Sequence, residues 1–104
     1  MCKQSLIFKD FGNVSLRKKD HIIIKGSGRS MSNLQNSDLV KVQLYNGKYN
    51  SKIKPSSDTP THLMIYNAFD EINGVVHSHS TYATAWAQAG VPIPCYGTTH
   101  ADYW

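Results

Sequence analysis

The sequence predicts an α/β fold in which a mixed or mainly antiparallel central sheet is flanked by helices. Residues 21–25 are rich in β-branched side chains, and residues 40–44 alternate between apolar and polar side chains, as strands do. Two later segments indicate helices, because 59–69 carries an apolar stripe of helical period and 81–89 is rich in alanine. An Asn-Gly hairpin signal at residues 46–47 argues against a purely parallel sheet.

The chain is long enough for one small domain. Its 104 residues are 40% hydrophobic and 11% aromatic, which is typical of a globular domain and not of a disordered segment. The formal net charge is +4, but basic and aromatic residues are not interleaved as they are in many nucleic-acid-binding proteins. No apolar run has transmembrane length, and the first residues lack a secretory signal. We therefore expect a cytoplasmic protein that binds neither nucleic acid nor membrane.

The first half of the chain predicts strands and turns. A brief strand at residues 14–16 and a polar turn at 17–20 precede the strand at 21–25. The glycine-rich loop 26–30 offers backbone N–H groups to an anion, although an ordinary turn is the simpler interpretation of the loop alone. After the strand at 40–44, the Asn-Gly turn predicts a return strand at 49–54.

The second half of the chain predicts two helices around a short strand. Two prolines break the sheet pattern over residues 55–60, and Ser57 or Asp58 is placed to cap the helix over 59–69. A strand opens at Val75. Helix 81–89 is predicted to end where Gly90 and then a proline follow. Residues 97–102 have the pattern of a turn that enters a further helix.

His77 and His79 are candidate metal ligands. Because alternate residues of a strand point to the same face, the two imidazoles are predicted to lie side by side. Neutral imidazoles suit zinc or a similar divalent metal, whereas the alternative is a pair of histidines that only form hydrogen bonds. A catalytic zinc takes three protein ligands. No other histidine has the spacing to complete the site, the candidates being His21, His62 and His100.

Asp58 is a candidate further ligand or acid–base group, because it lies at the start of the helix just before the histidine strand. A plain helix cap is the alternative interpretation of this residue.

Six longer blocks of the sequence form a pattern when taken in order. They are 12–15 (Gly-Asn-Val-Ser), 25–28 (Lys-Gly-Ser-Gly), 54–62 (Lys-Pro-Ser-Ser-Asp-Thr-Pro-Thr-His), 76–80 (Val-His-Ser-His-Ser), 87–90 (Ala-Gln-Ala-Gly) and 97–103 (Gly-Thr-Thr-His-Ala-Asp-Tyr). Together these blocks resemble the class II aldolase/epimerase family, and its L-ribulose-5-phosphate 4-epimerase branch above all. The resemblance implies the family's α/β fold and a zinc-dependent reaction on a phosphorylated keto-sugar.

The resemblance implies a role for each matched residue. His77, His79 and Asp58 match the metal site, and Asp58 and Asp102 match acid–base positions. Such epimerases break and re-form a C–C bond to interconvert L-ribulose 5-phosphate and D-xylulose 5-phosphate, with the metal as Lewis acid. The two aspartates favour an epimerase over an aldolase or dehydratase of the same family. The substrate phosphate is implied to lie among Asn13, Lys25, Ser27, Gly28, Ser56 and Ser57.

The chain also departs from the family pattern at both ends. Members normally begin with a helix before residues 12–15 and continue beyond Asp102, where a third metal histidine and a tyrosine from a neighbouring subunit are expected. We therefore expect residues 1–104 to form a partial domain, without that first helix and the C-terminal half, of an enzyme that is a homotetramer when complete. The alternative is an inactive fragment that retains weak metal or phosphate binding.

Overall fold

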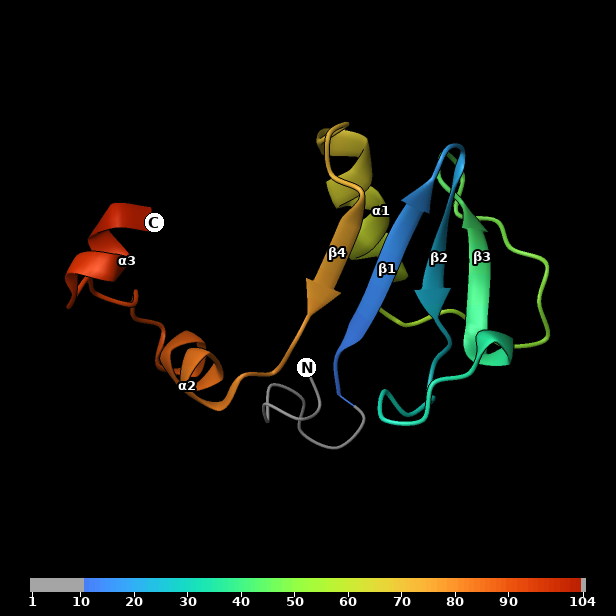
Figure 1. Ribbon diagram of the computed structural model, residues 1–104. Coiled ribbons are helices and arrows are strands. Elements are labelled where there is room, and N and C mark those ends of the chain that lie inside the picture. The colour runs from blue at the N-terminus through green and yellow to red at the C-terminus, as the bar shows by residue number, and fades with distance from the viewer. Residues whose placement is uncertain (1–10, 104) are drawn as a thin grey trace.

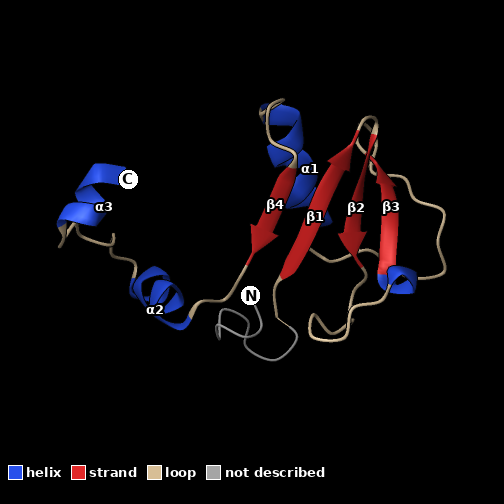
Figure 2. Ribbon diagram, viewed as in Figure 1, coloured by secondary structure: helices blue, strands red, loops and turns tan. Residues whose placement is uncertain are grey.

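The computed structural model describes residues 11–103, which form a sheet with one helix packed on one of its faces (Figures 1 and 2). The sheet has the strand order β3-β2-β1-β4, and its three pairings are antiparallel. The strands are β1 (Asn13–Lys18), β2 (His21–Lys25), β3 (Leu39–Gln43) and β4 (Gly74–His77). The helices are α1 (Thr59–Ala68), α2 (Thr81–Ala89) and α3 (Thr98–Tyr103), and a short 3-10 helix, η2 (Asn36–Asp38), leads into β3. The α/β fold class with a mainly antiparallel sheet is therefore confirmed.

The core lies between the sheet and α1. Because side chains alternate along β2 and β3, one face of the sheet gathers apolar groups, and Tyr66 of α1 packs against them. Full burial of an aliphatic or aromatic side chain contributes about 1.5–3 kcal/mol, so this contact holds the helix on the sheet. The core residues, each at most 1% exposed, are Ile22, Ile24, Val40, Val42 and Tyr66.

The opposite face of the sheet is open. Leu16 of β1 is 54% exposed and Val76 of β4 is 57% exposed, and α1 does not reach that face. Helices α2 and α3 follow β4 and lie beyond the sheet edge in Figure 1, with no buried residue in either. Within residues 11–103, the core is therefore built by the chain as far as β4.

Most predicted elements are present within one or two residues of their expected ends. β2 and α2 have the predicted bounds, and Gly90 ends α2 with a φ of +68°, a conformation that favours glycine. The predicted brief strand at 14–16 is longer than expected. Arg17 belongs to β1 and not to the polar turn, because it pairs with Ile22 of β2.

The return strand predicted at residues 49–54 is wrong. The turn itself forms, with the Gln43 amide donating to the Lys48 carbonyl at 2.8 Å. Val42 and Tyr49 then make one isolated bridge, and no strand follows.

After this bridge the chain crosses to the end of β2. The Ser27 amide donates to the Lys54 carbonyl at 2.8 Å, and the Ser56 amide donates to the Lys25 carbonyl at 2.9 Å. Residues 54–56 therefore do not extend the sheet beyond β3. Their backbone groups bond to the end of β2 and to the residues just after it. This crossing brings the segment before α1 next to the glycine-rich loop.

None of the helices within residues 11–103 has the length and hydrophobicity needed to cross a membrane. Expectations for the first ten residues, namely the missing secretory signal and the missing family helix, concern positions outside the described residues.

Candidate metal and phosphate site

His77 and His79 lie side by side at the end of β4. Their ring centroids are 4.8 Å apart and the ring planes are inclined by 40°. His79 is not part of the strand as predicted, because β4 ends at His77, the partner of Asn13 at the start of β1. β1 begins only at Asn13, after Gly12 with its φ of +103°, so the pairing with β4 stops at His77 and His79 has no strand partner in β1. The predicted proximity of the two imidazoles is nevertheless present.

The carboxylate of Asp58 joins β1, α1 and β4. Asp58 occupies the cap position of α1, but its side chain makes no capping hydrogen bond. Instead Asn13 Nδ2 donates to Oδ2 of Asp58 at 2.6 Å, and His77 Nδ1 lies 2.5 Å from the same oxygen. The interpretation of Asp58 as a plain helix cap is therefore wrong.

These contacts also set the charge of Asp58. The hydrogen bond from Asn13 is the main reason why the pKa of Asp58 lies below its usual value of 3.8, and the contact with His77 lowers it further, against a rise from partial burial. Asp58 is therefore ionised at neutral pH and acts as an acceptor. With Nδ1 of His77 donating to this carboxylate, Nε2 carries the lone pair that a metal requires.

A polar cavity of about 340 Å³ lies beside the histidines, at the end of the sheet where β1 begins and β2 and β4 end. Lys25 lines it although the residue is only 4% exposed, and its Nζ donates to the Arg29 carbonyl at 2.5 Å. The cavity brings together every residue predicted for phosphate binding and the three predicted for metal. They are Asn13, Lys25, Ser27, Gly28, Ser56, Ser57, Asp58, His77 and His79.

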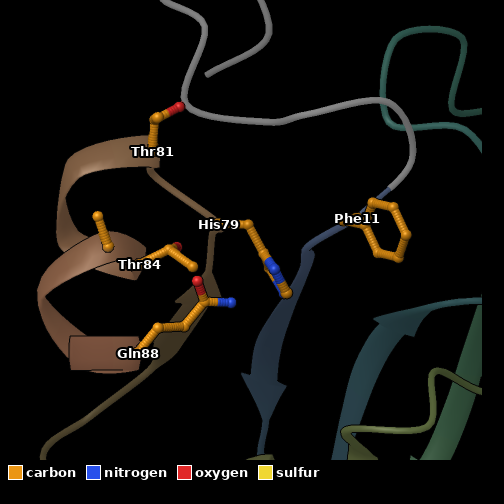
Figure 3. A pocket seen from close by; sticks show the side chains of 6 residues that line it. Phe11, His79, Thr81, Thr84 and Gln88 are labelled. Atoms are coloured by element: carbon orange, nitrogen blue, oxygen red, sulfur yellow. The ribbon is translucent and has the colours of Figure 1, made fainter. Parts of the chain in front are cut away.

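A second cavity, of about 510 Å³, continues from the histidines toward α2 (Figure 3). It shares Phe11 and His79 with the polar cavity, and the rings of these two residues are 5.6 Å apart. In Figure 3, Thr84 and Gln88 extend from α2 on one side of His79, with Phe11 on the other. Sequence reasoning missed these three residues, because Thr84 and Gln88 reach the site through the position of α2 after β4, and Phe11 reaches it from the segment before β1.

The donor chemistry at this site fits a divalent metal, since two imidazoles and an ionised carboxylate are ligands that zinc accepts. Among residues 11–103, however, no cluster of three or more such side chains already stands in ligand geometry. Asp58 here contacts His77 directly.

Asp102 is not part of this arrangement. It lies in α3, is exposed and lines neither of the two cavities. Figure 1 shows α3 beyond α2, away from the end of the sheet that carries His77. The structure therefore does not bring Asp102 together with the other predicted site residues of the same chain.

Comparisons with known proteins agree with this architecture. The chain is 45% identical over 103 residues to L-ribulose-5-phosphate 4-epimerase UlaF of Salmonella paratyphi B, covering 97% of this chain and 45% of the relative. Its structure is similar to that of an L-fuculose 1-phosphate aldolase, with a TM-score of 0.82 and 31% identity over 89% of this chain and 45% of the other. L-fuculose-1-phosphate aldolase of Thermus thermophilus gives a TM-score of 0.73 and 29% identity, over 84% of this chain and 44% of the other.

The chain thus spans about half the length of the proteins that it matches. All of residues 1–104 match the family described as the class II aldolase and adducin N-terminal domain, and on this evidence the chain belongs to that family.

Proposed function

We propose that this chain carries the substrate-binding half of a metal-dependent sugar-phosphate epimerase that interconverts L-ribulose 5-phosphate and D-xylulose 5-phosphate. The observation that carries the proposal is the polar cavity, in which phosphate-type residues and the histidine pair meet. The 45% identity to a protein named as an L-ribulose-5-phosphate 4-epimerase supports this choice of reaction.

The phosphate group of the substrate occupies the part of the cavity near Lys25. One cation surrounded by hydroxyl groups and by the backbone of a glycine-containing loop suits a phosphate dianion. Ser27 and Gly28 come from the loop after β2, and Ser56 and Ser57 come from the segment before α1. Because those two segments are hydrogen-bonded to each other, the pocket is formed before a ligand enters.

His77 and His79 would hold Zn²⁺ or a similar divalent metal, and Asp58 would support His77 from its other ring nitrogen. When bound there, the metal supplies Lewis-acid stabilisation of negative charge on the oxygens of the substrate. Asn13 and Asp58 orient His77, since the carboxylate accepts from Nδ1 and is itself held by the amide. The carbon chain of the sugar then extends past His79 toward the cavity beside α2.

Asp102 is the proposed acid–base residue, and it serves a neighbouring subunit of a homotetramer. The exposed position of α3, away from His77 of the same chain, supports action on another subunit. The 104 residues alone are expected to show little turnover, because a catalytic zinc takes three protein ligands and the described residues bring no three such side chains into ligand geometry. The alternative is a fragment that binds metal and phosphate but shows no turnover.

An aldolase or dehydratase acting on a phosphorylated sugar is the second candidate. The structural similarity to L-fuculose 1-phosphate aldolase supports it, with the TM-score of 0.82. The two candidates share the phosphate pocket and the metal site, and they differ in the fate of the cleaved C–C bond.

The first test measures binding of Co²⁺ and of inorganic phosphate by the 104-residue chain. Both are expected to bind, and His77→Ala should abolish Co²⁺ binding without changing the affinity for phosphate. A wild-type chain that binds no Co²⁺ contradicts the metal site, and one that binds no phosphate contradicts the pocket.

The second test follows the reaction in the presence and absence of a chelator, for the 104-residue chain and for the chain extended by the coding sequence downstream of Trp104. Chelator-sensitive interconversion of the two pentulose phosphates by the extended form supports the epimerase. Release of two fragments from a phosphorylated sugar, without epimerisation, assigns the protein to the aldolases instead.

A further inference from the structure

Three side chains on the covered face of β1 form hydrogen bonds to α1. They lie at alternate positions of the strand, and their partners follow one another along the helix. We call this series the β1–α1 ladder. Its contacts are Asn13 to Asp58 (2.6 Å), Ser15 Oγ to His62 Nδ1 (2.7 Å) and to the Tyr66 hydroxyl (2.8 Å), and Arg17 to the backbone carbonyls of Tyr66 and Phe69.

The ladder depends on a match between two periodicities. Two residues of a strand advance by roughly 6.6–6.8 Å, and four residues of a helix advance by about 6 Å. Because α1 runs beside β1 in the same direction, each second residue of the strand lies opposite each fourth residue of the helix. The pairs are 13 with 58, 15 with 62, and 17 with 66. Sliding α1 by one residue would break all of these contacts together.

The middle contact of the ladder is fully buried, with Ser15 and His62 each 1% exposed and Tyr66 0% exposed. The Tyr66 hydroxyl donates to the Ser15 carbonyl at 3.0 Å. A hydroxyl has one proton, so Ser15 Oγ donates to the Tyr66 oxygen and accepts from Nδ1 of His62. The proton positions in this network are therefore mutually fixed.

A contribution to stability alone does not explain why residue 62 is a histidine. Its Nε2 atom is buried without a hydrogen-bond partner among the described residues, which is destabilising, and an apolar side chain would avoid that cost. Apolar packing has no preferred direction, whereas a hydrogen bond fixes both distance and angle. His62 thus fixes where α1 lies along β1 and does not merely hold the helix on the sheet.

The position of α1 matters for Asp58. Its carboxylate is not held by a capping bond, and the His62 amide donates to the Asp58 carbonyl at 3.1 Å, one helical turn away. The place of the first turn of α1 along β1 therefore decides whether Asp58 reaches His77, which is 2.5 Å away.

We propose that Ser15, His62 and Tyr66 are positioning residues that set the carboxylate of Asp58 against His77. The inference rests on the proposed function, since it gives these residues a role in a metal site that they do not touch. It applies to the metal more than to phosphate, because the crossing between residues 25–27 and 54–56 holds much of the phosphate pocket without the ladder.

The experiment compares four variants of the 104-residue chain at a temperature where each is folded. His62→Leu and Ser15→Ala remove the central hydrogen bond. His62→Asn keeps an N–H donor near the position of Nδ1, and Val42→Ala weakens the core against which Tyr66 packs without removing a hydrogen bond of the ladder. The measurements are the affinities for Co²⁺ and for inorganic phosphate, and detection by NMR of the His77 Nδ1 proton in the metal-free protein.

We expect His62→Leu and Ser15→Ala to weaken Co²⁺ binding by about tenfold or more, as is usual when a partner behind a metal ligand is lost. Phosphate affinity should change much less, and the NMR signal of the His77 Nδ1 proton should disappear. His62→Asn and Val42→Ala should bind Co²⁺ like the wild type.

The proposal is overturned if His62→Leu binds Co²⁺ normally, if His62→Asn fails to rescue binding, or if Val42→Ala weakens it equally. If the wild type binds no Co²⁺, the proposed metal site fails. In that case the NMR signal of the His77 Nδ1 proton still tests the positioning role, because it is measured in the metal-free protein. A signal that persists in His62→Leu would overturn the proposal.

Discussion

Lys25 is a lysine in a place where lysine is rare. It is 4% exposed at the end of β2, and charged side chains are seldom buried unless they are paired. Its Nζ donates to the Arg29 carbonyl, so it is held at the wall of the polar cavity. A phosphate dianion bound in that cavity would add a favourable interaction with its charge.

Replacing Lys25 by Met keeps most of the aliphatic stem and removes the charge. Because a hydrogen bond to a charged group contributes about 1.5–3 kcal/mol, we expect inorganic phosphate to bind roughly 10- to 100-fold more weakly. Isothermal titration measures this change, with exposed Lys41 of β3 replaced by Met as the matched control. Equal phosphate affinity in Lys25→Met and the wild type would exclude Lys25 from the pocket.

Stability should fall on acidification because of His62. Burial lowers the pKa of His62 below 6.5, and the negative charge of Asp58 only partly opposes this shift. The unfolded chain therefore binds a proton at a higher pH than the folded chain. The stabilising contribution is complete above about pH 6.5 and is lost as the pH falls through the lowered pKa.

We expect Tm to drop between pH 7.5 and pH 5.5, and to drop less in His62→Asn, which has no titrating group at this position. Thermal unfolding at a series of pH values checks the difference in slope. Parallel curves for the two proteins would show that His62 does not titrate with folding.

At the scale of single residues, the sequence predicted which side chains meet but not how they bond. The spacing of His77 and His79 was sufficient for their proximity, because it depends on local geometry alone. The contacts of Asp58 were not predictable from spacing, since Asn13 is 45 residues away in the sequence. Only the packing of α1 along β1 brings these two residues together.

At the scale of elements, the junction between β1 and β4 depends on Gly12. A Cβ atom added there would lie 2.8 Å from the backbone carbonyl oxygen of His77, and the φ of +103° is unfavourable for any residue with a side chain. Neither the oxygen nor the strand that carries it moves easily. Gly12 is therefore required where the chain enters the sheet beside the histidines.

Gly12→Ala should lower the free energy of unfolding by about 1–3 kcal/mol, the usual cost of a strained backbone conformation. It should also weaken Co²⁺ binding, because His77 has to shift. Chemical denaturation and Co²⁺ titration measure the two effects. Gly90→Ala is the control, since its φ is +68° with no atom within 4 Å of the added Cβ. Similar Co²⁺ affinities in the two variants would contradict a role of Gly12 at the site.

The missing return strand shows that local sequence signals predict a turn but not the pairing of the strand expected after it. The Asn-Gly signal correctly predicted a turn, which is a local property. Which backbone the following residues pair with is a long-range choice: Ser56 pairs with Lys25 at the end of β2, and Lys54 pairs with Ser27 just after it. This choice places Ser56 and Ser57 in the polar cavity, so the failed prediction falls on a segment that forms the candidate site.

At the scale of the whole molecule, Asp102 lies in α3 whereas His77 ends β4, and Figure 1 shows α3 apart from that strand. If Asp102 serves a neighbouring subunit, two inactive variants should complement each other. We expect mixed subunits of His77→Ala and Asp102→Asn, in a form of the protein that turns over substrate, to recover activity. Each variant alone should remain inactive. If the subunits exchange and the mixture stays inactive, Asp102 and His77 act in the same site of one chain, and the proposal is contradicted.

The order of the strands has a consequence for folding. β1, β2 and β3 follow one another along the chain, whereas Asn13 of β1 pairs with His77 of β4 across 64 residues. Closing so long a loop costs entropy before any contact compensates for it, so we expect β4 to join the sheet last. The glycine-rich loop would then be in place before the histidines arrive. Substitutions in β4 should accordingly speed unfolding and leave the refolding rate nearly unchanged.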